Sequence, residues 1–148
     1  MSEIFYSIGG DVPRDFNDLK LKVKDGDGNK LKLKDIVKNK PILKEFSVGL
    51  KKPIKYKKKQ TLILEFDWEE PERRYEYALS ADCEKLKYQL IIPKKTELKS
   101  RILKVNPGTN EKIKATPSAD ISYQKNKTKV IWQSGKKLNE HDTFEFNW

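Results

Sequence analysis

The chain has 148 residues, enough for one domain with a sizeable core, and it combines 36% charged residues with a net charge of +10. No apolar run approaches the roughly 18–20 residues of a membrane-spanning helix, and the N-terminus lacks the basic and apolar regions of a secretory signal. The single cysteine, Cys83, excludes an intramolecular disulfide. These features predict a cytoplasmic protein that does not contact a membrane.

Alternating apolar and polar residues, the pattern of half-buried strands, dominate the chain from residue 19 onward. In chain order the runs cover residues 19–23, 31–33, 46–50, 54–56, 62–68, 75–79, 86–92, 100–105, 112–115, 119–123, 130–132 and 144–148. The only helical piece that we expect is a short turn at 35–39. The pattern predicts one antiparallel β-sandwich domain over residues 1–148, immunoglobulin-like or Greek-key, with roughly eight to ten short strands. A closed barrel is the structural alternative.

The stretch LKLKVKDGDGNKLKLK, which begins at residue 19, is predicted to form a hairpin. A three-residue loop, Gly26–Gly28, pairs Asp25 with Asn29 and Lys24 with Lys30, which keeps the apolar residues on one face. The last glycine of this loop would adopt a left-handed conformation. The opposite face would then carry six lysines, which must be solvated, paired with acids or used to bind an anion. They are Lys20, Lys22, Lys24, Lys30, Lys32 and Lys34.

The same loop begins like a calcium-binding EF-hand, with Asp25, Asp27 and Asn29 at ligand positions. However, Lys30 and Ile36 stand where that motif needs Gly and Glu. The flanking segments also have the pattern of strands, whereas the motif needs helices. The sequence therefore favours a loop without a metal ion.

Charge is arranged in blocks along the chain. Residues 19–59 carry fifteen lysines against four acids, whereas residues 60–84 carry eight acids against Arg73 and Arg74. The acidic block could neutralise a neighbouring lysine row across a sheet, or it could make the molecule electrically two-faced. Arg73 and Arg74 are candidates for a specific contact with a ligand, and local pairing with nearby glutamates is their structural alternative.

A second lysine-rich stretch, KKPIKYKKK at residues 51–59, interleaves lysines with Tyr56. Grooves that bind single-stranded nucleic acid combine basic residues with aromatic rings on which bases stack. Tyr56 alternates with Ile54, so a place in the core is the structural alternative for this ring.

Residues suited to catalysis are few. His141 is the only histidine, and a dyad with Cys83 would need the fold to join two distant segments. The acids at 67–72 surround Trp68, an arrangement found in glycosidases, but alternation directs them to solvent. We therefore expect a protein that is not an enzyme and that needs no cofactor or metal. A small hydrolase that uses these acids remains the third class of function.

Residues 44–94, from KEFSVGLKKPIKY to KYQLIIPK, are followed by a tryptophan strand and the closing FEFNW. In this order of aromatic and Pro-bounded strands, residues 42–148 resemble uncharacterised all-β domains of bacteria. Those domains stand at the C-terminal end of signalling or defence effector proteins. The resemblance implies a sensor or adaptor role and no catalytic residue.

The leading hypothesis is a recognition or sensor module that binds an anionic ligand, either nucleic acid or a nucleotide. The alternative is an adaptor that binds a protein partner or a fused effector domain. The predicted ligand-binding residues are Lys20, Lys22, Lys24, Lys30, Lys32, Lys34, Lys51, Lys52, Lys55, Tyr56, Lys57, Arg73 and Arg74.

Overall fold

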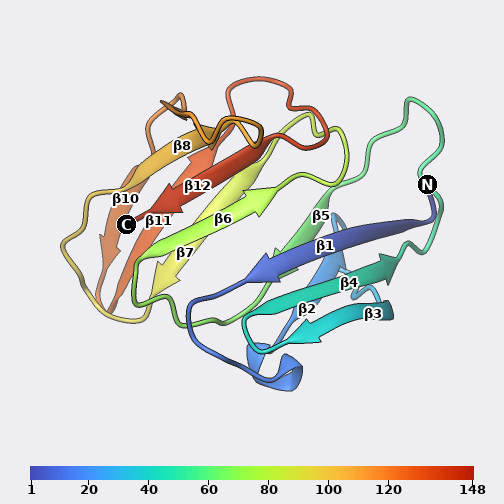
Figure 1. Ribbon diagram of the computed structural model, residues 1–148, viewed down its shortest axis with the longest axis horizontal. Coiled ribbons are helices and arrows are strands. Elements are labelled where there is room, and N and C mark those ends of the chain that lie inside the picture. The colour runs from blue at the N-terminus through green and yellow to red at the C-terminus, as the bar shows by residue number, and fades with distance from the viewer. The chain divides into compact units, whose positions relative to one another are not determined.

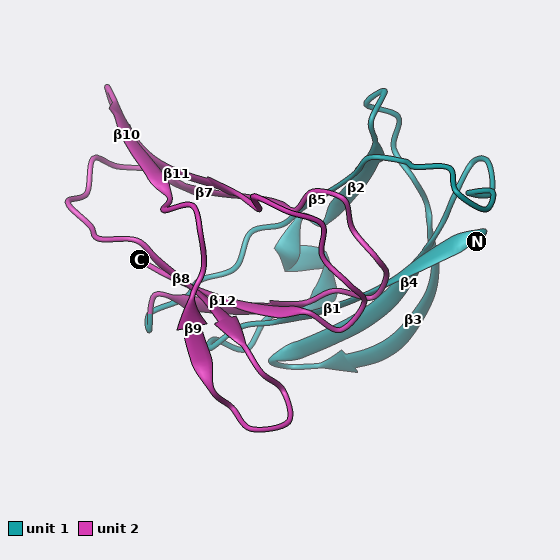
Figure 2. Ribbon diagram, turned by 90° about the horizontal axis from the view of Figure 1, so that it is seen from above, with its two compact units in different colours: residues 1–72 teal, residues 73–148 magenta.

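The computed structural model describes residues 1–148, and the fold is all-β, with twelve strands in four antiparallel sheets (Figure 1). None of the sheets closes on itself. The predicted fold class is confirmed. The chain divides into two compact units, residues 1–72 and 73–148 (Figure 2), and the prediction of a single domain stays a prediction. No helix is long and apolar enough to cross a membrane, since the only one is a single 3-10 turn.

Unit 1 contains two sheets, with strand orders β1-β4-β3 and β2-β5. Its buried aromatic residues, Tyr6 and Phe46, and the half-buried Phe16 are joined by ring contacts. Tyr6 stacks on Phe46 with their centroids 5.5 Å apart, and Phe16 meets the same ring edge-on at 5.8 Å. The elements are β1 (Glu3–Gly9), the 3-10 helix η1 (Phe16–Leu19), β2 (Lys22–Asp25), β3 (Leu33–Lys40), β4 (Leu43–Gly49) and β5 (Leu62–Glu65).

Unit 2 is a sandwich of a four-stranded sheet, β6-β12-β8-β9, and a three-stranded sheet, β10-β11-β7. Trp132, Phe144 and Phe146 are the large aromatic members of its core. Tyr88 of β7 stacks on Phe146 of β12 at 3.9 Å, so aromatic contact links the two sheets. The strands are β6 (Arg74–Ala78), β7 (Lys87–Ile92), β8 (Arg101–Val105), β9 (Lys112–Lys114), β10 (Asp120–Gln124), β11 (Lys127–Gln133) and β12 (Thr143–Asn147).

Three local predictions differ from the structure. Residues 35–39 are not helical but belong to β3, which pairs with β4 through two register shifts. Those bulges break the strict alternation by which a strand is recognised. Residues 54–56 form a loop, because Pro53 cannot continue a ladder. The N-terminal strand β1 was not anticipated, although Ile4, Tyr6 and Ile8 alternate as buried residues along it.

Candidate anion-binding surface

The turn of the predicted hairpin forms as expected. The N–H of Asp25 donates to the carbonyl of Asn29 at 3.0 Å, and Lys24 pairs with Lys30 in an antiparallel bridge. Gly28 has φ of 84°, the left-handed conformation for which glycine is suited. The local prediction for residues 24–30 is therefore confirmed.

The carboxylate of Asp25 holds this turn together. It accepts hydrogen bonds from the backbone N–H groups of Asp27 at 3.0 Å and Asn29 at 2.9 Å, and from the Asn29 side chain. The side-chain bond from Asn29 lowers the pKa of Asp25, and the two backbone bonds and the charge of Lys51 add to this against the opposing effect of burial. The oxygens that a calcium ion would need are thus committed to the turn.

Beyond the turn the two arms of the hairpin separate. β2 pairs with β5, whereas β3 pairs with β4 in the other sheet of unit 1. Lys20 lies at the end of η1 with φ of 48° and is not in a strand. The expected single face of six lysines is therefore wrong, because the long-range pairing outweighs continuation of the local hairpin.

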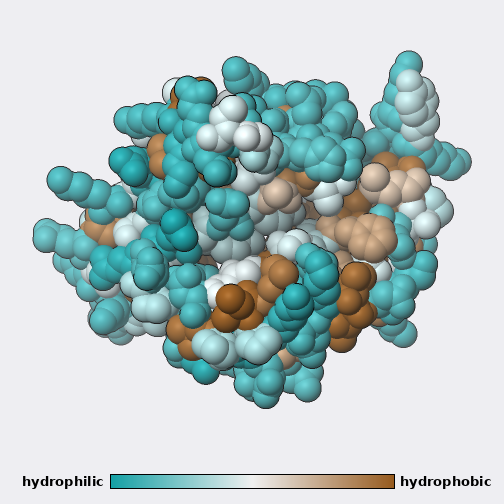
Figure 3. Space-filling model, in the orientation of Figure 1, coloured by the Kyte–Doolittle hydropathy of each residue, from teal (hydrophilic) through white to brown (hydrophobic).

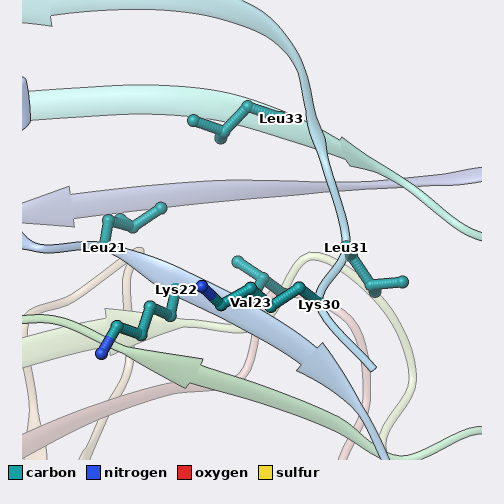
Figure 4. A pocket seen from close by; sticks show the side chains of 6 residues that line it. All are labelled: Leu21, Lys22, Val23, Lys30, Leu31 and Leu33. Carbon is teal, nitrogen blue, oxygen red and sulfur yellow. The ribbon is translucent and has the colours of Figure 1, made fainter. Parts of the chain in front are cut away.

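A small pocket of about 160 Å³ lies in the wedge where the arms separate (Figure 4). Leu21, Lys22 and Val23 line it from the β2 arm, and Lys30, Leu31 and Leu33 line it from the other arm. Its walls are thus apolar apart from two lysines. Lys22 and Lys30 make no ion pair within unit 1, although Glu65 lies opposite Lys22 in the ladder.

The acidic block neutralises one end of the basic segment. Lys24 pairs with Glu65 at 2.9 Å, and Lys20 pairs with Asp67 at 3.5 Å. Just beyond them, Arg14 pairs with Glu69 at 2.6 Å. We call these three ion pairs the paired end of unit 1. Of the three pairs, only Lys24–Glu65 joins two strands of a sheet, so neutralisation of a lysine row across a sheet is seen at one lysine.

Lys34 is also occupied, by an acid from another strand. Its ammonium lies 2.7 Å from Glu3 of β1, and the hydrogen bond and charge of that carboxylate raise the pKa of Lys34. Three of the six hairpin lysines thus have a carboxylate partner.

At the turn, two lysine-rich segments meet that are separated in the sequence. The N–H of Gly49 donates to the carbonyl of Lys32 at 3.1 Å, and Lys51 is close enough to Asp25 to lower its pKa. No ion pair within unit 1 involves the lysines gathered here. From this point the second segment continues as a loop whose Ile54 exchanges hydrogen bonds with Met1. We call the lysines of the turn and of this loop the open lysine end: Lys30, Lys32, Lys51, Lys52, Lys55 and Lys57, together with Tyr56.

Tyr56 belongs to the surface and not to the core. Its side chain is 89% exposed, and the ammonium of Lys57 lies 5.3 Å from the ring centroid. A turn in which the N–H of Lys58 donates to the carbonyl of Lys55 supports it. The loop between β4 and β5 stands out from unit 1 at the upper right of Figure 1, and Figure 3 shows a hydrophilic projection there. The core alternative for Tyr56 is therefore wrong.

Arg73 and Arg74 lie at the start of unit 2. The backbone of Arg73 has φ of 52°, and its carbonyl accepts a hydrogen bond from the N–H of Trp148 at 3.1 Å. Arg74 faces Asn147 in the β6–β12 ladder. Burial raises the pKa of the nearby Glu145, but the hydrogen bonds from Lys112 and Asn147 lower it overall, and the charge of Arg74 adds to this lowering. Glu69, Glu70 and Glu76 are the expected local partners, and of these Glu69 pairs with Arg14. A ligand role for both arginines stays a prediction.

The residues considered for catalysis have other surroundings. The His141 side chain is 83% exposed, whereas Cys83 packs against the core of unit 2. Asp67 and Glu69 are in ion pairs, and Glu70 accepts a hydrogen bond from the N–H of Asp11 at 3.3 Å. No group of three or more His, Cys, Asp or Glu side chains could hold a metal ion.

Sequence reasoning missed one unusual lysine, Lys44 of β4. It is only 1% exposed and lies on the same face of the strand as the buried Phe46 and Val48. The signal was present, because residues 44, 46 and 48 share one strand face. Lysine is rarely buried, so it was counted with the surface charge.

We compared the chain with known protein families, with curated proteins and with solved structures, and none of the three comparisons finds a match.

Proposed function

We propose that the chain is a recognition module for single-stranded nucleic acid, which binds at the open lysine end of unit 1. One observation carries this proposal. The start of the lysine-rich loop 51–59 lies beside the turn at residues 25–29, and Lys30, Lys32, Lys52, Lys55 and Lys57 form no ion pair within unit 1. The same loop carries the exposed ring of Tyr56. Lysines that only keep the surface solvated would not be expected to gather beside an exposed aromatic ring.

The chemistry of this surface fits a polyanion with unpaired bases. Lysine ammonium groups contact phosphates as point charges, which gives affinity with little sequence preference. A base that is free of a duplex can stack on Tyr56, whose ring already has a cation beside it. The nearby pocket is small and mostly apolar, so it offers few hydrogen bonds to define one particular nucleotide.

The proposal assigns binding, and not catalysis, to this surface. It also assigns the module to the cytoplasm, where the free thiol of Cys83 needs no disulfide partner. The single-stranded nucleic acid would either be the signal that the module senses or hold the module at one place. The residues that contact it would be those of the open lysine end, with Lys22 at the adjoining pocket.

The test is a titration of a fluorescently labelled single strand of about twelve nucleotides, followed by anisotropy from about 50 to 300 mM salt. We expect binding that weakens linearly on a log–log plot, with a slope of roughly 0.7 for each phosphate contacted. A duplex of the same length should bind more weakly, because its bases cannot stack on Tyr56. No binding to either form at the lowest salt would contradict the proposal.

A second candidate function is an adaptor that adds a partner's strand to β3. β3 is an edge strand whose eight residues are all exposed, and Ile36 and Val37 are more than half exposed. Figure 3 shows hydrophobic side chains on this part of the surface. The bulges and lysines of β3 oppose strand addition, so this function ranks second. A protein partner whose binding resists salt and is lost in an Ile36→Lys variant would favour it.

A further inference from the structure

A second pocket of unit 1, of about 370 Å³, has a different chemistry from the open lysine end. It lies where the segment before η1 passes the β3–β4 turn, and the N–H of Arg14 donates to the carbonyl of Pro41 there. Its polar lining consists of Arg14, Asp15, Asp18, Asn39 and Lys44. None of these residues belongs to the surface proposed above for nucleic acid.

Lys44 is the unusual member of this lining. Its side chain is 1% exposed, and it lies opposite Ile8 in the β1–β4 ladder. The ammonium donates one hydrogen bond, to the carbonyl of Lys40, and makes no ion pair. An ammonium has three N–H donors, and a buried one ordinarily has an anionic partner. Lys44 therefore retains unused donors and an uncompensated positive charge.

Two carboxylates that line the same pocket, Asp15 and Asp18, also lack a cationic partner. Asp15 stands at the N-cap of η1, yet its side chain makes no capping hydrogen bond. Asp15 and Asp18 are both exposed, and neither takes part in an ion pair. Arg14 cannot serve them fully, because its guanidinium is held by Glu69 at 2.6 Å. The pocket thus combines a buried cation with exposed anions.

We propose that this pocket binds a small zwitterion of the amino-acid type. The ligand's carboxylate would accept hydrogen bonds from the ammonium of Lys44, and its amino group would pair with Asp15 and Asp18. A simple anion would leave the two aspartates unpaired, and a simple cation would leave Lys44 without an anionic partner. Only a ligand that carries both charges satisfies both sides of the pocket.

The test uses the full chain labelled with ¹⁵N and follows its backbone amide resonances in NMR spectra. The probes are the free L-amino acids, added singly to about 10 mM, a concentration suited to millimolar affinity. We expect at least one of them to shift the amides of residues 14–18 and 39–44 in a saturable way. An equimolar mixture of acetate and methylammonium should not. The proposal is overturned if no amino acid gives saturable shifts, or if acetate alone gives the same shifts.

Matched variants separate binding from folding. Lys44→Met should weaken binding of the responsive amino acid at least about tenfold, which corresponds to one charge-assisted hydrogen bond. Lys38→Met, at an exposed lysine of the neighbouring strand, should leave it unchanged. If Lys44→Met fails to fold, the exposed pair Asp15→Asn and Asp18→Asn gives the second variant, with the same loss expected. Full affinity in a folded variant of either kind overturns the proposal.

Discussion

The two ends of the basic segment at residues 20–34 differ in what their charges contact. At the paired end, Lys20 and Lys24 lie within 4 Å of Asp67 and Glu65. At the open lysine end, Lys30 and Lys32 have no acidic partner and lie near further lysines. The same residue type, a few positions apart in one segment, is thus neutralised in one place and available in the other.

The antiparallel register of β2 and β5 explains this difference. Lys22 lies opposite Glu65, whereas Asp25 lies opposite Leu62. The acids that follow β5 therefore continue past the start of β2, where they meet Lys20 and Arg14. Thr61, just before β5, lies against Gly26 of the turn instead. The antiparallel direction of β5 thus determines which residues of its flanking segments lie beside the basic segment at 20–34. A count of charges along the chain cannot show this.

The largest expected effect on stability comes from disturbing the contact between Gly10 and Trp68, which lies next in the chain to two acids of the paired end. A Cβ added at Gly10 would lie 2.3 Å from the indole of Trp68, whose N–H donates to the carbonyl of Val12 at 2.7 Å. Gly10→Ala should therefore lower the free energy of unfolding by about 1–3 kcal/mol, because the indole must leave its place. Urea unfolding followed by tryptophan fluorescence measures this.

Gly49→Ala is the matched control for that variant. The added methyl group would have no neighbour within 4 Å, so the free energy of unfolding should change by no more than about 0.5 kcal/mol. Equal stability of the Gly10→Ala and Gly49→Ala proteins would show that Trp68 is not seated against Gly10.

Tyr56→Ala should weaken binding of a single strand by about 1–3 kcal/mol, the contribution of one stacked base. Its stability should not change, because the ring is 89% exposed. Tyr123 offers a matched control, since it is 46% exposed and Lys95 lies 5.9 Å from its ring. Anisotropy titrations compare the two variants, and an equal loss in both would remove the special role of Tyr56.

Asp25→Asn should make the free energy of unfolding less dependent on pH in the acidic range. The hydrogen bond from the Asn29 side chain holds the pKa of Asp25 below its ordinary value, so ionised Asp25 stabilises the fold above that ordinary value. This contribution is lost as pH falls through the lower pKa of the folded state. The variant should be less stable than the wild type at neutral pH, and the difference should shrink in acid. Urea midpoints measured between neutral pH and about pH 3 test this. A difference that stays constant with pH would contradict it.

The smallest expected effect is the coupling between Lys24 and Glu65. Both side chains are partly exposed to solvent, so a double-mutant cycle with Lys24→Gln and Glu65→Gln should give about 0.2–1 kcal/mol. The same cycle with Lys30→Gln in place of Lys24→Gln should give no coupling. Coupling of equal size in both cycles would mean that Glu65 interacts with Lys30 as strongly as with Lys24, which would contradict the difference between the paired end and the open lysine end.

The local part of this arrangement could be predicted from the sequence, whereas the long-range part could not. The turn at residues 25–29 depends on Gly28 and on the side chains of Asp25 and Asn29, which act within a few residues. The choice of β5 as the partner of β2 depends on residues about forty positions away. Because alternation is equally compatible with several partners, it predicted the strands without their order.

The candidate surface was predictable only in outline. The lysines of 20–34 and 51–59 could be named from the sequence, but the ion pairs of Lys20, Lys24 and Lys34 appear only once the strands are paired. Exposure of Tyr56 follows from the loop conformation, which the alternation with Ile54 concealed. Lysine is usually exposed, so the burial of Lys44 could not be predicted from its residue type.

The most direct test of the proposed function is the salt dependence of single-strand binding in two variants of equal net charge. One carries Lys30→Gln, Lys32→Gln and Lys55→Gln, and the other carries Lys125→Gln, Lys127→Gln and Lys136→Gln at exposed positions of unit 2. We predict that the slope of log affinity against log salt falls by about 2 in the first variant and stays near the wild-type value in the second. Equal slopes in the two variants would mean that net charge alone attracts nucleic acid, which would contradict a binding surface at the open lysine end.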